Sequence, residues 1–299
     1  KTCLALEIGG SRLGAAMVSP TGELAVAHRA NTPAGGGEAI IHCLTELAAQ
    51  AVKEAGTAPT VVGISSAGVI DTERGTVADS GETMPGWKGT RLTEPFATHF
   101  GCPAFAANDA QCALEGELWK GGHSADSDAP VVLLTLGTGL GGAWAHGGHI
   151  VRGRHLHAGH FGNPRRFHPL LRRAVTVEET VSGAGLAVLH RALHGADSRF
   201  VELGGPELMQ ACAQGDTQAY ATVATWSSEL AALIGDIRWT LDPALILLGG
   251  GVIGSKAIWW PMLTRVLNEM QVETPVAPAS LGNTAGLVGA AHLAWSRLP

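Results

Sequence analysis

Long hydrophobic runs are missing from the sequence. Its apolar stretches, such as 131–136 and 244–248, stop well short of the roughly 20 residues that cross a bilayer. The apolar stretch at 3–6 is followed at once by Glu7 and two glycines, which leaves no room for the apolar core of a signal peptide. We therefore expect a cytoplasmic protein with no membrane partner.

Cysteine and charge are also scarce. Five cysteines at wide, irregular spacing argue against a disulfide framework and against a cysteine-rich metal site. Only 15% of the residues are charged, and the net charge of −6 gives no field that would attract nucleic acid. The chain is instead 45% apolar with 41 glycines, enough for a buried core and many tight turns. These proportions favour a globular protein that binds a small molecule.

Two distant segments, 4–27 and 131–151, follow one pattern. Each has an apolar strand, a glycine-rich turn, a strand of small residues, a second glycine turn and a third strand. Paired glycines between apolar runs supply the positive φ of tight hairpins, so each segment is predicted to form a three-stranded meander. An internal repeat in a chain of 299 residues predicts two similar lobes.

Helical and strand patterns alternate through the rest of the chain. Apolar periodicity predicts a helix that ends at Gly56, helices over 110–119, 177–193, 217–240 and 284–298, and strands over 60–65, 103–107 and 244–248. Such alternation indicates the α/β class, with helices packed on mixed sheets.

Glycine-rich turns follow three of the predicted strands. The run Gly137-Thr-Gly-Leu-Gly-Gly matches a dinucleotide fingerprint, but a strand rather than a helix follows it and no acid occurs between 129 and 177. Glycines let backbone N–H groups approach phosphate oxygens, and hydroxyl and guanidinium groups add donors. Hairpin formation alone would explain one such loop, whereas three favour a polyphosphate ligand such as ATP. The predicted ATP-binding residues are Gly9, Gly10, Ser11, Arg12, Gly137, Thr138, Gly139, Gly249, Gly250 and Gly251.

Asn108 and Asp109 come directly after the predicted strand 103–107, where a helix begins. Open α/β sheets bind ligands at the carboxyl ends of their strands, and a carboxylate there could accept a proton from a substrate hydroxyl. The alternative is that Asp109 only caps the helix.

The ordered set of motifs resembles the ROK family of sugar kinases over nearly the whole chain. The matching stretches are EIGGSR (7–12), GISSAGVID (63–71), MPGWKG (84–89), NDAQ (108–111), GTGLGG (137–142), AGHFG (158–162), LGGG (248–251) and AGLVGAA (285–291). The resemblance implies an actin-like, ribonuclease H-like duplicated ATPase fold with two lobes, 1–118 and 119–299, and a last helix, 284–298, that packs back toward the first lobe. It also implies a homodimer that phosphorylates a hexose or N-acetylhexosamine with ATP and Mg²⁺.

The same resemblance assigns roles to individual residues. Asp109 matches the catalytic base that deprotonates the sugar O6 for attack on the γ-phosphorus. Glu7 stands where most members have Asp, near the Mg²⁺ and the phosphates. The residues that match sugar contacts are Ser66, Gly68, Asn108, Asp109, His160, Asn163 and Glu178.

Two departures from the family pattern concern metal and substrate. Members commonly hold a structural zinc with one His and three Cys, but Asn163 replaces that His and 161–177 contains no Cys, so no such zinc is predicted. Four histidines nearby could bind a metal, although no acid or thiol adjoins them: His155, His157, His160 and His168.

The sugar pocket of most members has Ala-Gly-Glu, whereas this chain has Ala158-Gly159-His160. That change resembles bacterial N-acetylmannosamine kinases, and a histidine both donates and accepts hydrogen bonds where a glutamate only accepts. The sequence therefore predicts N-acetylmannosamine as substrate. Glucokinase or another ROK hexokinase is the first alternative, and a catalytically weak or silent sugar-binding protein, suggested by Glu7 and Asn163, is the second.

Overall fold

The computed structural model describes residues 2–81, 84–123, 128–195 and 204–298. The chain forms two compact units. The first unit comprises Lys1–Ser124, Arg152–Ala158 and Ser280–Pro299, and the second comprises Ala125–Val151 and Gly159–Ala279. Among the described residues, no helix combines the length and the apolar character that a bilayer crossing needs.

The first unit is built on a five-stranded mixed sheet of order β3-β2-β1-β4-β7. The antiparallel strands come from the first meander, and β4 and β7 run parallel to β1. The strands are β1 (Cys3–Ile8), β2 (Arg12–Val18), β3 (Leu24–Asn31), β4 (Val61–Ser66) and β7 (Ala104–Asn108), with a small separate hairpin of β5 (Val69–Asp71) and β6 (Thr76–Asp79).

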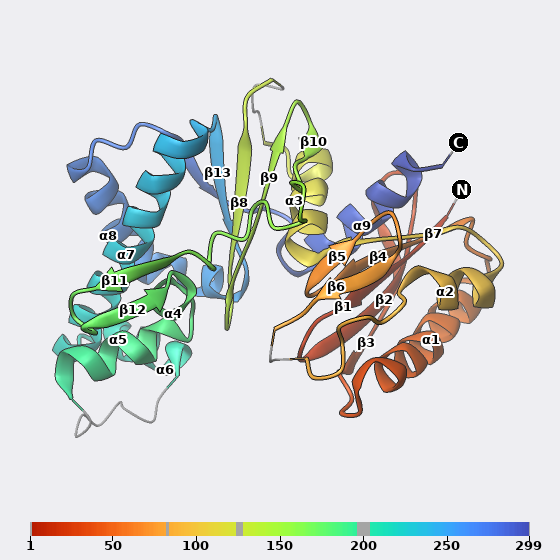
Figure 1. The fold of residues 1–299 in the computed structure, drawn as a ribbon, viewed down its shortest axis with the longest axis horizontal. Helices are drawn as coiled ribbons and strands as arrows, with labels where there is room; N and C mark the ends of the chain where they lie inside the picture. The colour runs from red at the N-terminus through yellow and green to blue at the C-terminus, as the bar shows by residue number, and fades with distance from the viewer. Residues whose placement is uncertain (1, 82–83, 124–127, 196–203, 299) are drawn as a thin grey trace. The chain divides into compact units, whose positions relative to one another are not determined.

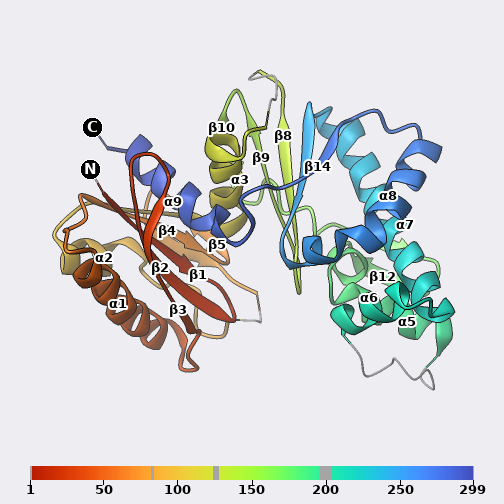
Figure 2. The same cartoon turned by 180° about the vertical axis from the view of Figure 1, so that it is seen from behind.

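Alternating side chains of β1 pack against two different helical layers. Leu4, Leu6 and Ile8 lie in one core with α1 (Gly36–Ala55) and α2 (Thr93–Phe100). Cys3 and Ala5 face α9 (Ala285–Ser296). Figures 1 and 2 show α1 and α2 on one face of the sheet and α9, beside α3 (Asp109–Lys120), on the other.

Helix α9 approaches its neighbours closely because glycines face it. A Cβ at Gly63 of β4 would collide with the carbonyl of Ala290, and one at Gly116 of α3 would lie 2.5 Å from the carbonyl oxygen of Ala285. A Cβ at Gly289 of α9 would in turn collide with the carbonyl of Cys112. Small residues on both helices therefore hold the last helix of the chain on the first unit.

The second unit repeats the arrangement with a mixed sheet of order β10-β9-β8-β13-β14. Its strands are β8 (Val131–Leu136), β9 (Leu140–His146), β10 (His149–Ile150), β13 (Leu245–Gly249) and β14 (Val276–Pro278); β11 (Arg165–His168) and β12 (Arg173–Thr176) form a hairpin. Its helices are α4 (Glu178–Val181), α5 (Gly185–His194), α6 (Gly205–Ala213), α7 (Thr217–Leu241) and α8 (Lys256–Glu269), and short 3₁₀ turns are η1 (Gly251–Ser255) and, in the first unit, η2 (Gly282–Thr284).

The core of the second unit lies between one face of its sheet and the helices. Val132, Leu134 and Leu136 of β8 pack with Trp226 of α7 and Trp259 of α8, both of which are fully buried. Both predicted meanders and the α/β class with mixed sheets are confirmed.

The predicted helix 177–193 is wrong, because the structure divides it into α4 and α5. Ser182 has an extended backbone with ψ of 171° and so ends α4. Its hydroxyl accepts a hydrogen bond from the backbone N–H of Gly185 at 3.1 Å, which begins α5. The backbone N–H of Gly183 meanwhile donates to the carbonyl of Gly137 at 2.7 Å, so the break serves the loop after β8.

Candidate active site

Polar residues of the first unit gather at the carboxyl ends of its three parallel strands. Glu7 pairs with Ser65 across β1 and β4, and Ser66 pairs with Asn108 across β4 and β7. The turn after β1 carries the first predicted phosphate loop, so one sheet edge holds Glu7, that loop and Asp109. This is the edge at which α/β sheets bind ligands.

Asn108 rather than Asp109 is the N-cap of α3. Its Oδ1 accepts from the backbone N–H groups of Ala110 (3.0 Å) and Gln111 (3.3 Å). Its Nδ2 donates to the carbonyl of Gly68 (2.9 Å) and to Oδ1 of Asp109 (2.8 Å). These four bonds use both donors and both lone pairs of the amide. Asn108 therefore fixes the Gly68 loop and the Asp109 carboxylate, and its predicted direct sugar contact stays a prediction.

Asp109 is the first residue of α3, and its side chain is exposed. Besides the bond from Asn108, Oδ1 of Asp109 accepts from the backbone N–H of Ala110 at 2.9 Å. Two donors on one oxygen hold the carboxylate in a single orientation, as a general base requires.

Glu7 is a half-buried acid that lies near Asp109. Burial raises the pKa of the Glu7 carboxyl above its ordinary value of 4.5, the positive charge of Arg29 opposes the rise, and the negative charge of Asp109 adds to it. Glycines make room for the carboxyl: a Cβ at Gly14 would lie 3.4 Å from its Oε2, and one at Gly286 3.2 Å from its Oε1.

This cradle fits a hard divalent cation. Carboxylate oxygens are ligands that Mg²⁺ prefers, and the Glu7 carboxylate supplies them in this space. The Ser65 hydroxyl faces the same side, 3.1 Å from a Cβ built at Gly286.

The turn after β4 forms the predicted sugar loop around Gly68. Gly68 has φ of 97°, and a Cβ there would lie 2.9 Å from the carbonyl oxygen of Asp79. Trp87, which is fully buried, donates from Nε1 to the carbonyl of Ala67 at 3.1 Å. The Ser66 hydroxyl is also buried and donates to the same carbonyl at 2.9 Å. Ser66 therefore shapes the loop, and its direct contact with a sugar stays a prediction.

Sequence reasoning missed the role of Trp87. Its signal was the run MPGWKG (84–89), one of the stretches that resemble the family, although that resemblance implies no function for the indole. Thr83, which departs from the family's frequent Asn, lies outside the described residues.

The first phosphate loop is a tight turn with an exposed tip. Gly9 N–H donates to the carbonyl of Arg12 at 2.9 Å, and Thr32 holds the loop through bonds to Gly9 and Ser11. Gly10, Ser11 and Arg12 are exposed. Their backbone and side-chain donors are thus available to an anion.

Two further glycine loops meet in the second unit. Parallel pairing of β8 with β13 sets Gly249 opposite Thr135, so the loops 137–139 and 249–251 leave the sheet side by side. Gly250 has φ of 85°, and a Cβ there would lie 2.5 Å from the carbonyl oxygen of Leu136. Thr138 is exposed at the tip of the first loop.

The predicted sugar residues of the second unit lie on one connected segment. Gly159, with φ of 90°, packs against Ala143 of β9 and turns the chain toward His160. The carbonyl of His160 accepts from Asn163 N–H at 3.1 Å, and the carbonyl of Gly162 accepts from Glu178 N–H at 3.0 Å. The structure thus brings His160, Asn163 and Glu178 together.

A salt-bridged hairpin, β11–β12, occupies the stretch where the resemblance would place zinc ligands. Glu229 of α7 accepts from Arg166 at 2.6 Å and from Nε2 of His168 at 3.2 Å, and Thr180 donates to it at 3.5 Å. Over the part of the chain that the structure describes, three or more His, Cys, Asp or Glu side chains do not come together in a metal-binding group.

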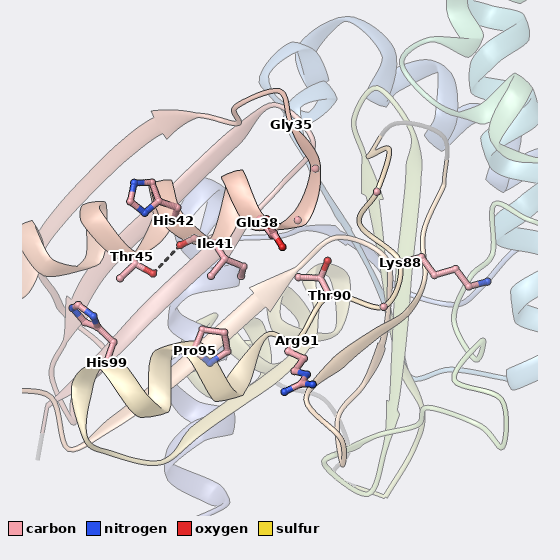
Figure 3. Close-up of a pocket in the computed structure, with 14 residues that line it drawn as sticks. Gly35, Glu38, Ile41, His42, Thr45, Lys88, Thr90, Arg91, Pro95 and His99 are labelled. Atoms are coloured by element: carbon pink, nitrogen blue, oxygen red, sulfur yellow. Dashed lines mark hydrogen bonds between the residues drawn. The ribbon is translucent and has the colours of Figure 1, made fainter.

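The first unit has a concavity of about 900 Å³ that is bordered by α1, α2 and residues 86–91. Figure 3 shows the side chains that line it. His42 and Thr45 of α1 and His99 of α2 line it, with Lys88 and Arg91 from the connecting stretch. Lys88 pairs with Asp79 at 3.0 Å and Arg91 with Glu94 at 2.6 Å. None of the predicted site residues belongs to its wall.

Comparison with known proteins shows which family the chain matches. The model of the ROK family matches residues 3–297. An N-acetyl-D-glucosamine kinase of Salmonella heidelberg (strain SL476) is 30% identical over 308 residues, which cover 96% of this chain and 97% of the relative.

Two solved structures are also similar. A ROK family glucokinase from Streptomyces griseus, in complex with glucose and AMPPNP, superposes with a TM-score of 0.83 at 26% identity over 99% of this chain and 100% of its own. A Listeria monocytogenes protein proposed to be an N-acetylmannosamine kinase superposes with a TM-score of 0.81 at 26% identity over 98% of each chain.

Proposed function

The chain belongs to the ROK family and is a sugar kinase with the actin-like ATPase fold, and from that premise we propose that it transfers the γ-phosphate of ATP to O6 of N-acetylmannosamine. The sequence predictions of the family, the fold and a kinase that uses ATP are confirmed. The identity of the sugar and the roles of individual residues form the proposal.

His160 is the observation that carries the choice of sugar. A histidine in place of the family's usual glutamate offers a donor as well as an acceptor, which suits an acetamido group with its carbonyl oxygen. Two of the similar proteins carry names of kinases for N-acetylated hexosamines, and these support an acetamido sugar. The 2-epimer N-acetylglucosamine and glucose itself are the competing substrates.

Asp109 is the proposed catalytic residue. It would accept the proton of the sugar O6 as that oxygen attacks the γ-phosphorus in line, and the bonds from Asn108 and Ala110 would keep the carboxylate oriented. The glycine loops would supply backbone N–H donors to the phosphates, with Ser11, Arg12 and Thr138 adding side-chain donors. Gly68 and Asn163 would border the sugar.

Glu7 is the proposed protein ligand on the Mg²⁺ side. Magnesium, when bound with ATP, neutralises the charge that develops on the phosphates. Glu7 would hold the cation directly or through water, in the space that Gly14 and Gly286 leave open. The longer side chain, compared with the family's usual Asp, would move the cation farther from the strand.

A homodimer in the cytoplasm completes the proposal. The homodimer comes from the family resemblance, and the cytoplasmic location is the expectation from the sequence, which the requirement for ATP fits. Light scattering on the purified protein measures the first part directly.

Coupled ADP release with MgATP tests the substrate assignment. The panel is N-acetylmannosamine, N-acetylglucosamine, glucose, mannose and fructose, with His160→Glu beside the wild type. We expect the highest kcat/KM with N-acetylmannosamine. In His160→Glu, kcat/KM on that sugar should fall by about 10- to 100-fold, because the acetamido carbonyl oxygen loses its donor and is left unpaired in the bound state.

The matched control is His155→Glu, the same substitution at an exposed histidine of the same segment, which should leave the preference unchanged. A higher kcat/KM with glucose or N-acetylglucosamine would replace the substrate and keep the kinase. Binding of a sugar without any ADP release would indicate a silent sugar-binding protein.

A further inference from the structure

Glu178 lies between two loops to which different ligands are assigned. Its backbone N–H donates to the carbonyl of Gly162 at 3.0 Å, on the sugar side. Its Oε2 accepts from the backbone N–H of Leu140 at 2.8 Å, directly after the phosphate loop 137–139. One residue therefore bonds both loops at once.

Glycines on both sides make this approach possible. A Cβ at Gly139 would lie 2.6 Å from Oε2 of Glu178, and a Cβ at Gly162 would lie 3.2 Å from Cβ of Glu178. Neither glycine position has room for a side chain while the glutamate holds its place. The missing side chain at Gly139 therefore leaves room for the Glu178 carboxylate, in addition to allowing the turn.

The other end of α4 is bonded to the same phosphate loop. Gly183 N–H donates to the carbonyl of Gly137 at 2.7 Å, and Ala184 N–H to that of Thr138 at 3.4 Å. Ser182 N–H bonds back to the carbonyl of Glu178 at 3.1 Å. The four residues of α4 and the break after them therefore hold the phosphate loop from both of its ends.

The Leu140 bond is the one that a sugar could influence. A carboxylate accepting from a backbone N–H forms a charge-assisted bond, stronger and shorter than a neutral one. The exposed Glu178 side chain has a second oxygen to offer to a sugar hydroxyl, and a sugar on that oxygen would restrict the rotation of the carboxylate. A fixed carboxylate keeps Leu140, and with it the loop, in one conformation.

We propose that Glu178 is a positioning residue that transmits sugar binding to the loop holding the ATP phosphates. The inference rests on the proposed function in assigning sugar to Glu178 and phosphate to 137–139. Coupling of this kind is reciprocal, so sugar should tighten nucleotide binding and nucleotide should tighten sugar binding by the same factor. Coupling through Glu178 would link the two substrates even though they do not need to contact each other.

Calorimetric titration of the full chain with Mg²⁺-AMPPNP, first without sugar and then with saturating N-acetylmannosamine, tests the proposal. Without sugar, Glu178→Ala should weaken AMPPNP binding by about five- to tenfold, because Leu140 N–H loses its acceptor. With sugar, the wild type should gain at least about fivefold in AMPPNP affinity, and Glu178→Ala should gain nothing.

The matched control is Glu179→Gln at the next residue. Glu179 caps the same short helix through Thr176 N–H (2.9 Å) and pairs with Arg173 (2.6 Å), but it has no bond to the phosphate loop. It should bind AMPPNP within about twofold of the wild type in both titrations. Glu178→Asp is the second variant: it keeps the charge, is one methylene too short to reach Leu140, and should behave like Glu178→Ala even if the alanine variant does not fold.

Sugar-free AMPPNP affinity equal to that of the wild type in a folded Glu178 variant would overturn the proposal and leave Glu178 as a sugar contact only. That arm contains no sugar, so it tests the bond to the phosphate loop even if the substrate assignment fails. The arm with sugar tests the coupling, and an equal gain in AMPPNP affinity in the wild type and in Glu178→Ala would overturn it. In kinetics the same variants should raise KM for ATP more than they lower kcat, which a purely structural defect would not do.

Discussion

Glu7 combines a cost in stability with the role of cation ligand that we propose for it. Its raised pKa means that the folded chain binds a proton more tightly there than the unfolded chain does. The contribution of Glu7 to stability is therefore fully present below the ordinary value of 4.5 and is lost as the pH rises through the raised pKa. At neutral pH the buried charge destabilises the fold, and a divalent cation would relieve that cost.

Glu7→Gln should therefore be more stable than the wild type at pH 7 and nearly inactive. The expected Tm difference, measured without nucleotide or Mg²⁺, shrinks as the pH is lowered through the raised pKa of the wild-type carboxyl and disappears below 4.5. Glu23→Gln, a change of the same charge on the first unit, is the control. A Glu7→Gln variant that is less stable at pH 7 and equally active would show that the carboxylate neither costs stability nor holds a cation.

At the scale of elements, close packing of α9 on α3 depends on glycine. A Cβ on Gly289 would collide with the carbonyl oxygen of Cys112, which belongs to helix backbone and has little room to move. Gly289→Ala should therefore lower the free energy of unfolding by about 3 kcal/mol, as overpacking of a tight interface does. In chemical denaturation, Gly254→Ala should change stability by less than about 0.5 kcal/mol, since its Cβ meets no described atom within 4 Å. Equal midpoints for the two variants would mean that α9 can shift away.

The β11–β12 hairpin is held to α7 by the carboxylate of Glu229. Removal of its carboxylate leaves the buried His168 without its acceptor and leaves Arg166 only the longer pair with Asp236, at 3.8 Å. We expect Glu229→Ala to cost about 1–3 kcal/mol in the free energy of unfolding, the range for hydrogen bonds to charged groups. Glu269→Ala, at an exposed pair with Arg265, should cost far less. If the two variants were equally stable, the network would not hold the hairpin.

Elements with a regular pattern could be predicted from the sequence, whereas those set by tertiary contacts could not. The meanders were predictable because apolar runs and the paired glycines between them are local signals. The helix predicted over 177–193 was wrong because the apolar periodicity continues across Ser182 and Gly183, while the fold uses those residues to bond the phosphate loop. Helices α2 and α8, which contain Pro95 and Pro261, were not predicted.

The candidate site was predictable to a similar degree. Asp109 and the glycine loops follow strands and Glu7 lies near the end of β1, so the position of each at the sheet edge of its own unit could be inferred from strand order. The bond from Asn108 to Gly68, the bond from Trp87 to Ala67 and the bond of Glu178 to Leu140 depend on residues far apart in the chain, for which the sequence offers no local signal.

At the scale of the whole molecule, each unit presents glycine-rich turns at the carboxyl ends of a mixed sheet, and the duplicated meander supplies one of these turns in each unit. Phosphoryl transfer depends chiefly on positioning and charge neutralisation, which such turns and a few oriented carboxylates supply. The chemical step itself is assigned to a single side chain, Asp109.

Turnover of Asp109→Asn therefore tests the central claim most directly. The asparagine keeps the shape of the side chain and accepts the bonds from Asn108 and Ala110, but it cannot take the proton of a sugar hydroxyl. With MgATP and the preferred sugar, kcat should fall by about 10²–10⁴-fold, while sugar affinity measured by calorimetry stays within a few-fold of the wild type. A kcat close to that of the wild type would contradict the assignment of Asp109 as the base.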